Sequence, residues 1–317
     1  ICDNVLMSSS KSDTIFINNN NSNLYLGGLN EKQILKVSSG ANCSLIGGNG
    51  NVFLKNINFE FEKTTTLFNG FQGQIISLES CTINLTTYEE TIGSPQTSTI
   101  IINSSVLYLN SEHSSCIGNS ENSELNISIE SSTVFSVTTS NNSPCIGNKL
   151  NSTSNYINIK NSFIKSSIES IESTFPVIGS SSHIQIESST LNLEATKGSA
   201  IGGGQIQDLS TSIEIINSTI TANSMGNSAT IGGGEIKMTT TISITEHSHI
   251  YAFNSNKLGQ NGAAIGGGTG TVIDSIRIEN SYINCSSNYL GSAIGSGNSN
   301  AGSIVKEITI KYSSIYA

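Results

Sequence analysis

Hydrophobic residues recur along the chain in a two-part pattern. The first part is an aliphatic residue followed by glycine. The second has the form Φ-x-Φ-x-x-S-x-Φ, where Φ is aliphatic or, rarely, aromatic. Both parts are clearest between Gly198 and Ala222, which reads GSAIGGG, a polar loop and IEIINSTITA. A pattern that returns in this way predicts one supersecondary unit repeated many times.

The repeat is established from Leu45 onward and returns about every 28 residues on average. Its isoleucine–glycine pairs begin at Ile46, Ile92, Ile117, Ile146, Ile178, Ile201, Ile231, Ile265 and Ile294. The spacing varies too much for a short-period solenoid, and it fits three short strands joined by loops of different length. We therefore expect an all-β protein of about ten coils with three short strands per coil.

A sharp corner is expected inside each coil. Residues two apart in a strand share a face, so Ile213 and Ile215 point the same way. Ile220 lies five residues after Ile215 and would face the opposite side of an unbroken strand. The chain must therefore turn at Asn217, and Asn suits this position because it tolerates the left-handed region. The equivalent corner residues are Ser104, Ser131, Asn161, Ser188 and Asn280.

Successive coils are expected to stack in parallel, because an antiparallel sandwich would not explain one register motif in every coil. Like residues then form ladders, with Ile201, Ile231, Ile265 and Ile294 pointing inward. The glycine runs that begin at Gly202 and its counterparts lack the Lys-Ser/Thr of a phosphate-binding loop. We interpret them as corners where coils approach closely.

The two ends of the chain differ from its middle. Residues 1–44 contain alternating apolar residues without the repeat, which predicts capping strands before a β-helix over residues 45–317. No charged leader precedes Ile1, which fits a signal peptide that was removed or lies outside this sequence. The last residues break off within a repeat. We expect further chain, or self-association, to cover the last coil.

Composition narrows the range of partners. Charged residues make up 12% of the chain, and the net charge is −9 with 14 Lys and Arg scattered singly. We expect no nucleic-acid partner, because no basic face can form against phosphates. We also expect no membrane span, because no run approaches the ~18 apolar residues that a membrane helix needs.

The chain resembles a known family in its alternating strands, Asn/Ser corners and inward aliphatic ladders. These features look like the right-handed parallel β-helix of the pectate-lyase type. More specifically, AAIGGG followed by I-x-I-x-x-S-x-I-x-A resembles β-helical repeats of large bacterial and protist cell-surface proteins. The resemblance is best over residues 198–317. It implies the fold and an extracellular location, but this fold hosts lyases, hydrolases, adhesins and passive stalks.

Catalytic side chains are sparse. A β-helix lyase or glycosidase needs clustered Asp with Arg or Lys on one outer face, whereas this chain has four Asp and a single Arg, Arg277. Asp208 and Asp274 follow two IGGG stretches, two coils apart. His247 and His249 lie in the unit with one extra residue, where a bulge could present them. We interpret the histidines as a surface pair, with a ligand or base role as the less favoured alternative.

The six cysteines show no metal-binding spacing, and we expect no metal and no cofactor. If any pair is bridged, we expect it to be Cys2 with Cys43. Cys116 and Cys145 occupy the same position in consecutive units, and a stack of free thiols is favoured over a disulfide. Small core-filling roles are expected for the other two, Cys81 and Cys285.

Nine Asn-x-Ser/Thr sequons occur, about as many as chance predicts for this composition. They would be available for N-glycosylation in a eukaryotic secretory pathway. Asn103 and Asn217 are poor candidates because they lie at the tight corner. The remaining candidates are Asn20, Asn42, Asn84, Asn126, Asn141, Asn151 and Asn284.

These observations together predict a non-enzymatic extracellular β-helix that serves as a stalk, surface adhesin or filament subunit. The alternative is a carbohydrate-binding or polysaccharide-degrading β-helix. Outward aromatic residues that flank the third strand could form a patchy platform for sugar rings. They are Phe163, Tyr251, Tyr282 and Tyr316.

Overall fold

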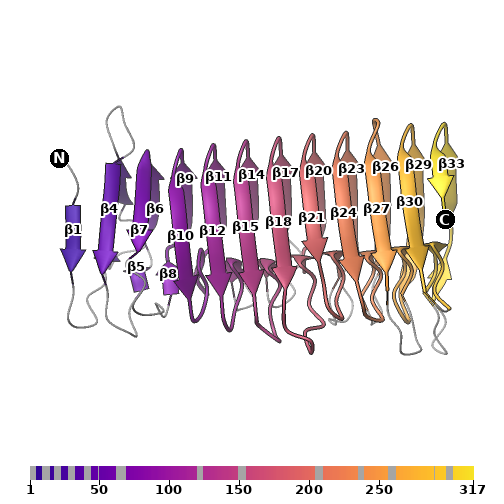
Figure 1. The fold of residues 1–317 in the computed structure, drawn as a ribbon, viewed down its shortest axis with the longest axis horizontal. Helices are drawn as coiled ribbons and strands as arrows, with labels where there is room; N and C mark the ends of the chain where they lie inside the picture. The colour runs from indigo at the N-terminus through magenta and orange to yellow at the C-terminus, as the bar shows by residue number, and fades with distance from the viewer. Residues whose placement is uncertain are drawn as a thin grey trace.

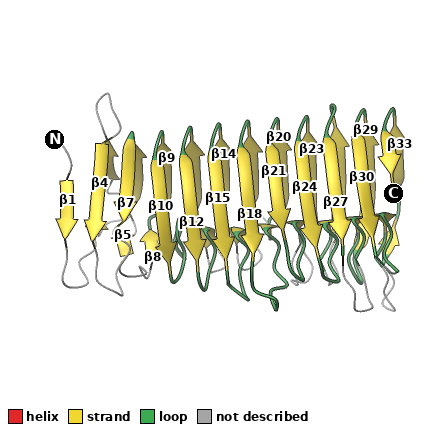
Figure 2. Ribbon diagram, in the orientation of Figure 1, coloured by secondary structure: helices red, strands yellow, loops and turns green. Residues whose placement is uncertain are grey.

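The structure is a computed structural model of the 317-residue chain. It describes residues 5–8, 15–17, 23–27, 33–38, 44–48, 50–61, 69–119, 124–148, 155–203, 210–234, 239–255, 262–288, 290–297 and 303–317. All regular elements among these residues are β-strands (Figure 2). The predicted all-β class is therefore confirmed.

The strands stack side by side along one axis into an elongated rod, from the first described strand at one end to the last strand at the other (Figure 1). Three columns of strands run along this rod, which we call sheets A, B and C. Most coils contribute one strand to each column, so the prediction of three short strands per coil is confirmed.

Sheet A contains twelve strands. In order along the rod they are β1 (Val5–Ser8), β4 (Gln33–Ser38), β7 (Ile57–Phe61), β10 (Thr82–Thr87), β12 (Val106–Ser111), β15 (Thr133–Thr138), β18 (Phe163–Ile168), β21 (Thr190–Glu194), β24 (Thr219–Ser224), β27 (His249–Asn254), β30 (Tyr282–Ser287) and β34 (Ser314–Tyr316).

Sheet C also contains twelve strands, and the last two, β32 and β33, both pair with β29. They are β3 (Asn23–Gly27), β6 (Asn51–Lys55), β9 (Ile75–Glu79), β11 (Thr99–Asn103), β14 (Asn126–Glu130), β17 (Tyr156–Lys160), β20 (His183–Glu187), β23 (Ser210–Ile216), β26 (Thr239–Thr245), β29 (Val272–Glu279), β32 (Ile304–Val305) and β33 (Ile308–Lys311).

Sheet B holds the isoleucine–glycine pairs, and its strands are shorter. A three-stranded part consists of β2 (Ile15–Ile17), β5 (Ser44–Gly48) and β8 (Asn69–Phe71). A seven-stranded part consists of β13 (Ile117–Asn119), β16 (Ile146–Asn148), β19 (Ile178–Gly179), β22 (Ile201–Gly202), β25 (Ile231–Gly232), β28 (Ile265–Gly266) and β31 (Ile294–Gly295). Isolated parallel bridges from Ile92 to Phe71 and to Ile117 connect the two parts.

Neighbouring coils pair in parallel and place like residues side by side. Ile213 of β23 pairs with Ile242 of β26, for example. In sheet B, Ile201, Ile231 and Ile265 are fully buried, and Ile294 is half-buried. The predicted inward isoleucine ladders are therefore confirmed, and the antiparallel sandwich is excluded. Burying an isoleucine side chain contributes about 1.5–3 kcal/mol, so these ladders form the core of the rod.

The corner between sheets C and A lies at the residues where the sequence pattern predicts it. All six predicted corner residues have positive φ, from 47° at Asn217 to 50° at Ser131. In the unit with one extra residue, both Glu246 and His247 adopt positive φ, at 55° and 62°. The extra residue is therefore absorbed in the corner, and the ladders continue on both sides of it.

The glycines of sheet B mark a second tight corner, as expected. Gly202 has φ of 128°, and a Cβ at this position would lie 2.1 Å from the carbonyl oxygen of Gly232 in the next coil. Only glycine allows the backbone of one coil to approach the next so closely.

These findings establish a parallel β-helix. Its longer sheets hold twelve strands, so the coil count differs slightly from the ten expected. Near the N-terminus, β3 already pairs with β6 in parallel register. The division between capping strands 1–44 and a β-helix over 45–317 stays a prediction.

Candidate functional site on the outer face of sheet A

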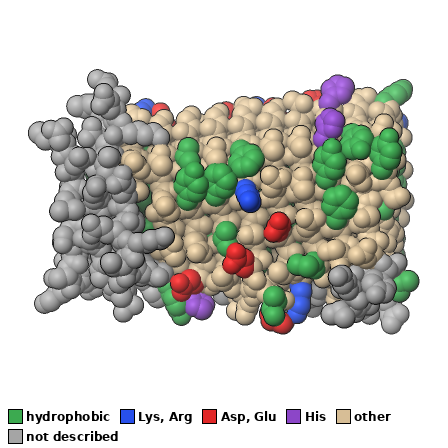
Figure 3. Space-filling model, in the orientation of Figure 1, with side chains coloured by type: hydrophobic (Ala, Val, Ile, Leu, Met, Phe, Trp, Pro, Cys, Tyr) green, Lys and Arg blue, Asp and Glu red, His purple; other side chains and the backbone are tan. Residues whose placement is uncertain are grey.

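The outer face of sheet A is a long regular surface formed by twelve parallel strands. Side chains in each strand alternate between core and solvent. In β24, Thr219 is exposed and Ile220 is buried. The outward residues are mostly Thr, Asn and Ser, with aromatic rings in two places. Figure 3 shows two groups of hydrophobic side chains on this face, with further single ones below them.

The first group, the N-terminal aromatic patch, consists of Tyr108 of β12, Phe135 of β15 and Phe163 of β18. Tyr108 and Phe135 are register partners, and their rings stack 4.9 Å apart at an interplanar angle of 1°. The rings of Phe135 and Phe163 lie 5.8 Å apart at 54°. Such pairs contribute about 0.5–1.5 kcal/mol each, and Tyr108 is partly open to solvent, with 45% of its surface exposed.

The second group, the C-terminal aromatic patch, consists of Tyr251 of β27, Tyr282 of β30 and Tyr316 of β34. The ring of Tyr282 lies 5.9 Å from that of Tyr251 and 5.4 Å from that of Tyr316. His249, on the same strand as Tyr251, also stacks against Tyr282, at 5.7 Å and 27°. Tyr316 is 60% exposed, so this patch is open to solvent.

A shallow hollow of ≈ 360 Å³ lies between the two patches. Its outward-facing lining comes from β15, β18, β21 and β24. Lys165 pairs in register with Phe135, and the carboxylate of Glu194 also belongs to the lining. The hollow therefore combines an aromatic ring with one charge of each sign and several hydroxyl and amide groups. The complete lining is Phe135, Ser136, Val137, Lys165, Ser166, Ser167, Asn192, Leu193, Glu194, Thr221 and Asn223.

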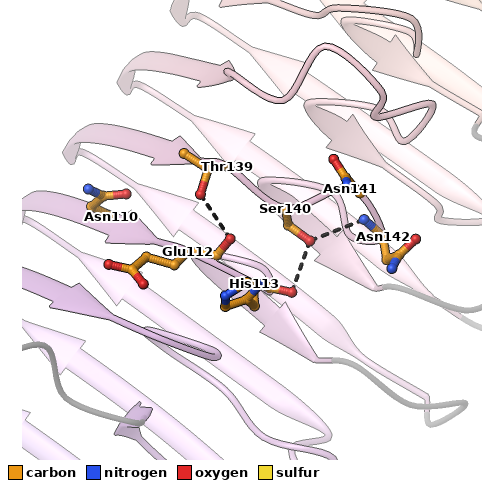
Figure 4. A pocket seen from close by; sticks show the side chains of 7 residues that line it. All are labelled: Asn110, Glu112, His113, Thr139, Ser140, Asn141 and Asn142. Atoms are coloured by element: carbon orange, nitrogen blue, oxygen red, sulfur yellow. Dashed lines mark hydrogen bonds between the residues drawn. The ribbon is translucent and has the colours of Figure 1, made fainter. Parts of the chain in front are cut away.

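A second hollow, of ≈ 440 Å³, lies beside the turns that follow β12 and β15 (Figure 4). Hydrogen bonds link these turns across the coils. Thr139 Oγ1 donates to the carbonyl of Glu112, and Ser140 Oγ donates to the carbonyl of His113, both at 2.9 Å. The imidazole of His113 packs on Tyr88 with ring centroids 4.1 Å apart. The hollow is lined entirely by polar residues, namely Asn110, Glu112, His113, Thr139, Ser140, Asn141 and Asn142.

The charged residues that sequence reasoning considered for catalysis are placed as follows. Asp274 Oδ1 forms an ion pair with Lys306 Nζ at 2.5 Å. His247 and His249 are both exposed, as a surface pair would be. Asp208 lies outside the described residues. Among the residues that the structure describes, no three or more His, Cys, Asp or Glu side chains gather where they could hold a metal ion.

The candidate glycosylation sites are distributed over several surfaces. Asn84 on β10, Asn126 at the start of β14 and Asn141 in a bend are exposed, and Asn284 on β30 is half-buried. Asn217 at the corner is also exposed, and its Nδ2 donates to Ser188 Oγ at 3.2 Å, so its side chain points outward. The predicted sites Asn20, Asn42 and Asn151 lie outside the described residues.

The cysteines that the structure describes are free thiols buried in the core. Cys116 and Cys145 are both fully buried, which agrees with the expected stack of free thiols. Burial and a hydrogen bond with Cys145 raise the pKa of the Cys116 thiol well above its usual value. Burial also raises the pKa of Cys285, to about 11. Cys2 and Cys43 lie outside the described residues, so their disulfide stays a prediction.

Comparison with known proteins adds no assignment. No family model, no curated protein and no solved structure matches this chain. We also find no candidate membrane-spanning helix in the described part of the chain.

Sequence reasoning missed two of the six rings in these patches. It named Phe163 but not Tyr108 and Phe135, which stack directly. The signal was available, because each ring directly follows a ladder residue, Leu107 or Val134. Aligning these two ladder residues between coils places the rings side by side.

Proposed function

We propose that the protein is a non-enzymatic extracellular β-helix that acts as a stalk, surface adhesin or filament subunit. The observation that carries this proposal is the outer face of sheet A, a long regular surface of Thr, Asn and Ser with exposed aromatic rings. Interaction surfaces are enriched in aromatic residues and depleted in charge. Tyr, Ser and Asn also combine apolar contact area with adaptable hydrogen bonding.

The stacked coils provide a continuous scaffold for this face. Over most of the rod, neighbouring coils are hydrogen-bonded in all three columns, and the isoleucine ladders bury a continuous core. Stacked repeats of this kind form elongated bodies with extended binding surfaces.

Labelling of intact, non-permeabilised source cells with antibodies against the rod tests the extracellular location.

An adhesion assay with beads that carry the chain tests the contact face. The variant Tyr108→Thr/Phe135→Thr replaces both rings by threonine. The ladder tolerates this residue, because Thr221 occupies the same ladder further along the rod. We expect this variant to reduce bead attachment several-fold. The matched control Tyr156→Thr changes a ring on sheet C and should leave attachment unchanged. Equal attachment by all forms would argue against sheet A as the contact face.

The second candidate function is carbohydrate binding or polysaccharide degradation. The specific observation in its favour is the hollow where Phe135 lies beside Lys165, since aromatic faces pack on sugar rings and charged groups bind their substituents. A glycan-array screen, together with assays for release of unsaturated or reducing sugars, tests it. Turnover abolished by Asp274→Asn or His247→Ala would overturn the non-enzymatic proposal.

A further inference from the structure

One sequon lies in the middle of the C-terminal aromatic patch. Asn284 of β30 pairs in register with Tyr251 on one side and with Tyr316 on the other. Neighbouring strands are ~4.8 Å apart, so both tyrosines flank the asparagine side chain directly. Tyr282 precedes Asn284 by two residues in the same strand and therefore points from the same face. Three tyrosine rings thus surround one glycosylation acceptor.

The sequon is oriented for modification. In Asn284-Cys285-Ser286, the Cys285 side chain is buried in the core, and Ser286 is exposed. Because side chains alternate along a strand, Asn284 and Ser286 share the outer face with the tyrosines. The amide of Asn284 therefore points to solvent from the floor of the aromatic patch.

We propose that Asn284 carries an N-linked glycan whose first N-acetylglucosamine packs on Tyr251, Tyr282 and Tyr316. The inference rests on the extracellular location in the proposed function, because transfer requires the secretory pathway. In the transfer, a bond forms between Asn284 Nδ2 and C1 of the sugar. The C1–O bond to the diphosphate of a lipid-linked oligosaccharide donor breaks, and the lipid diphosphate leaves as the amide loses a proton.

The chemistry of the first sugar fits the patch. One face of the pyranose ring carries C–H groups and is apolar, and the planar amide linkage holds this ring close to the strand. The tyrosine rings are inclined to each other at 41° and 49° around Tyr282, so they form an uneven platform rather than one closed stack. A sugar held there would cover apolar area that is now exposed, including Tyr316, which is 60% exposed.

The other described sequons lack this arrangement. Asn84 has Tyr108 as a register partner on one side. Asn141 lies in an exposed bend, where its Oδ1 accepts a hydrogen bond from Ser170 Oγ. Asn141 therefore provides a matched control, since a glycan there has no tyrosine platform beneath it.

The test uses the full chain secreted from a eukaryotic cell line. Peptide mass spectrometry after enzymatic deglycosylation in H2¹⁸O measures the occupancy of Asn284 and Asn141. Thermal unfolding then compares the glycosylated protein with Asn284→Gln and Asn141→Gln. We expect occupied Asn284 and a fall of about 2 °C in Tm for Asn284→Gln, with little change for Asn141→Gln. In a Tyr282→Thr background, the Asn284→Gln effect should be clearly smaller, because one of the three rings beneath the sugar is gone. The ladder tolerates Thr here, as it holds Thr219 two coils earlier.

The outcomes separate this inference from the proposed function. Occupied Asn141 with unoccupied Asn284 would overturn the inference alone. An occupied Asn284 whose removal leaves Tm unchanged, or lowers it equally in the Tyr282→Thr background, would also overturn it. Absence of glycan at every sequon of protein from the natural source would overturn the inference and leave the proposed function standing, because labelling of intact cells tests the extracellular location separately.

Discussion

The backbone N–H of Ser132 donates a hydrogen bond to the hydroxyl of Ser162, 3.1 Å away in the next coil. The same hydroxyl donates to the carbonyl of Lys160 at 2.7 Å. Each repeat serine thus closes the corner of its own coil and accepts a hydrogen bond from the previous coil. The bond between coils recurs for the pairs Ser105–Ser132, Ser162–Ser189, Ser189–Ser218, Ser218–Ser248 and Ser281–Ser313.

Ser162→Ala should destabilise the rod by about 1–3 kcal/mol, because it leaves the buried N–H of Ser132 without an acceptor. Ser162→Cys should cost less, since Cys81 occupies this position in an earlier coil and its thiol still donates to the carbonyl of Glu79. Urea unfolding measures both. Ser167→Ala on the outer face is the control, and equal midpoints for Ser162→Ala and this control would contradict the proposed role of the hydroxyl.

Asn161→Val should destabilise the protein by on the order of 1–3 kcal/mol, because a β-branched residue is strained at the φ of 49° that this corner requires. Asn161→Gly should be nearly neutral, since glycine adopts positive φ without strain. Asn161 is exposed, so lost burial does not complicate the comparison. Equal stability of the two variants, measured in urea, would show that the corner does not depend on left-handed geometry.

Gly202→Ala should cost on the order of 4 kcal/mol or more, or prevent folding, because its Cβ would lie 2.1 Å from the carbonyl oxygen of Gly232. Gly27→Ala is the matched control, since its Cβ would meet the carbonyl oxygen of Lys55 at an ordinary 3.6 Å. Circular dichroism and thermal unfolding compare the two. A well-folded Gly202→Ala protein with an unchanged Tm would mean that the coils approach less closely at this corner.

Stability should fall as the pH rises from about 9 to about 11. The unfolded Cys285 thiol ionises near its usual pKa of 9.0, whereas burial raises the pKa of the folded thiol to about 11. The unfolded state therefore binds fewer protons in this range, and the free energy of unfolding decreases with pH. Cys285→Ala should reduce this decrease, and Ala is compatible with the site because Ala252 is its register partner. An identical pH profile for the variant would contradict the assignment.

Much of the fold could be predicted because the spacing of residues within one repeat determines where its strands and corners lie. The odd spacing of five positions from Ile215 to Ile220 requires a corner at Asn217, and the structure has positive φ there. The hydrogen bond from the N–H of Ser132 to the hydroxyl of Ser162 was not predicted, although both serines belong to the motif. These residues are 30 positions apart, and the motif does not show which backbone group a side chain reaches in the next coil.

The aromatic surface was predicted less completely for a related reason. Loops of different length separate the strands, so cross-strand neighbours become visible only when the ladder residues of successive coils are aligned. Tyr156 and His183 illustrate this on sheet C, where their rings stack 4.9 Å apart although 27 positions separate them in the sequence. Propensity and periodicity predict which residues face outward, whereas register decides which of them touch.

The stacking of coils also determines how the rod would respond to tension. The hydrogen bonds between coils run along its long axis, so a pull at the two ends loads them lengthwise. One coil must lose its bonds in all three columns together before it detaches, while the coils beyond it stay intact. Extension would then proceed in steps, each of which releases one repeat of about 28 residues, or roughly 90 Å of extended chain. A tether built in this way would absorb mechanical work gradually and would not fail at a single point.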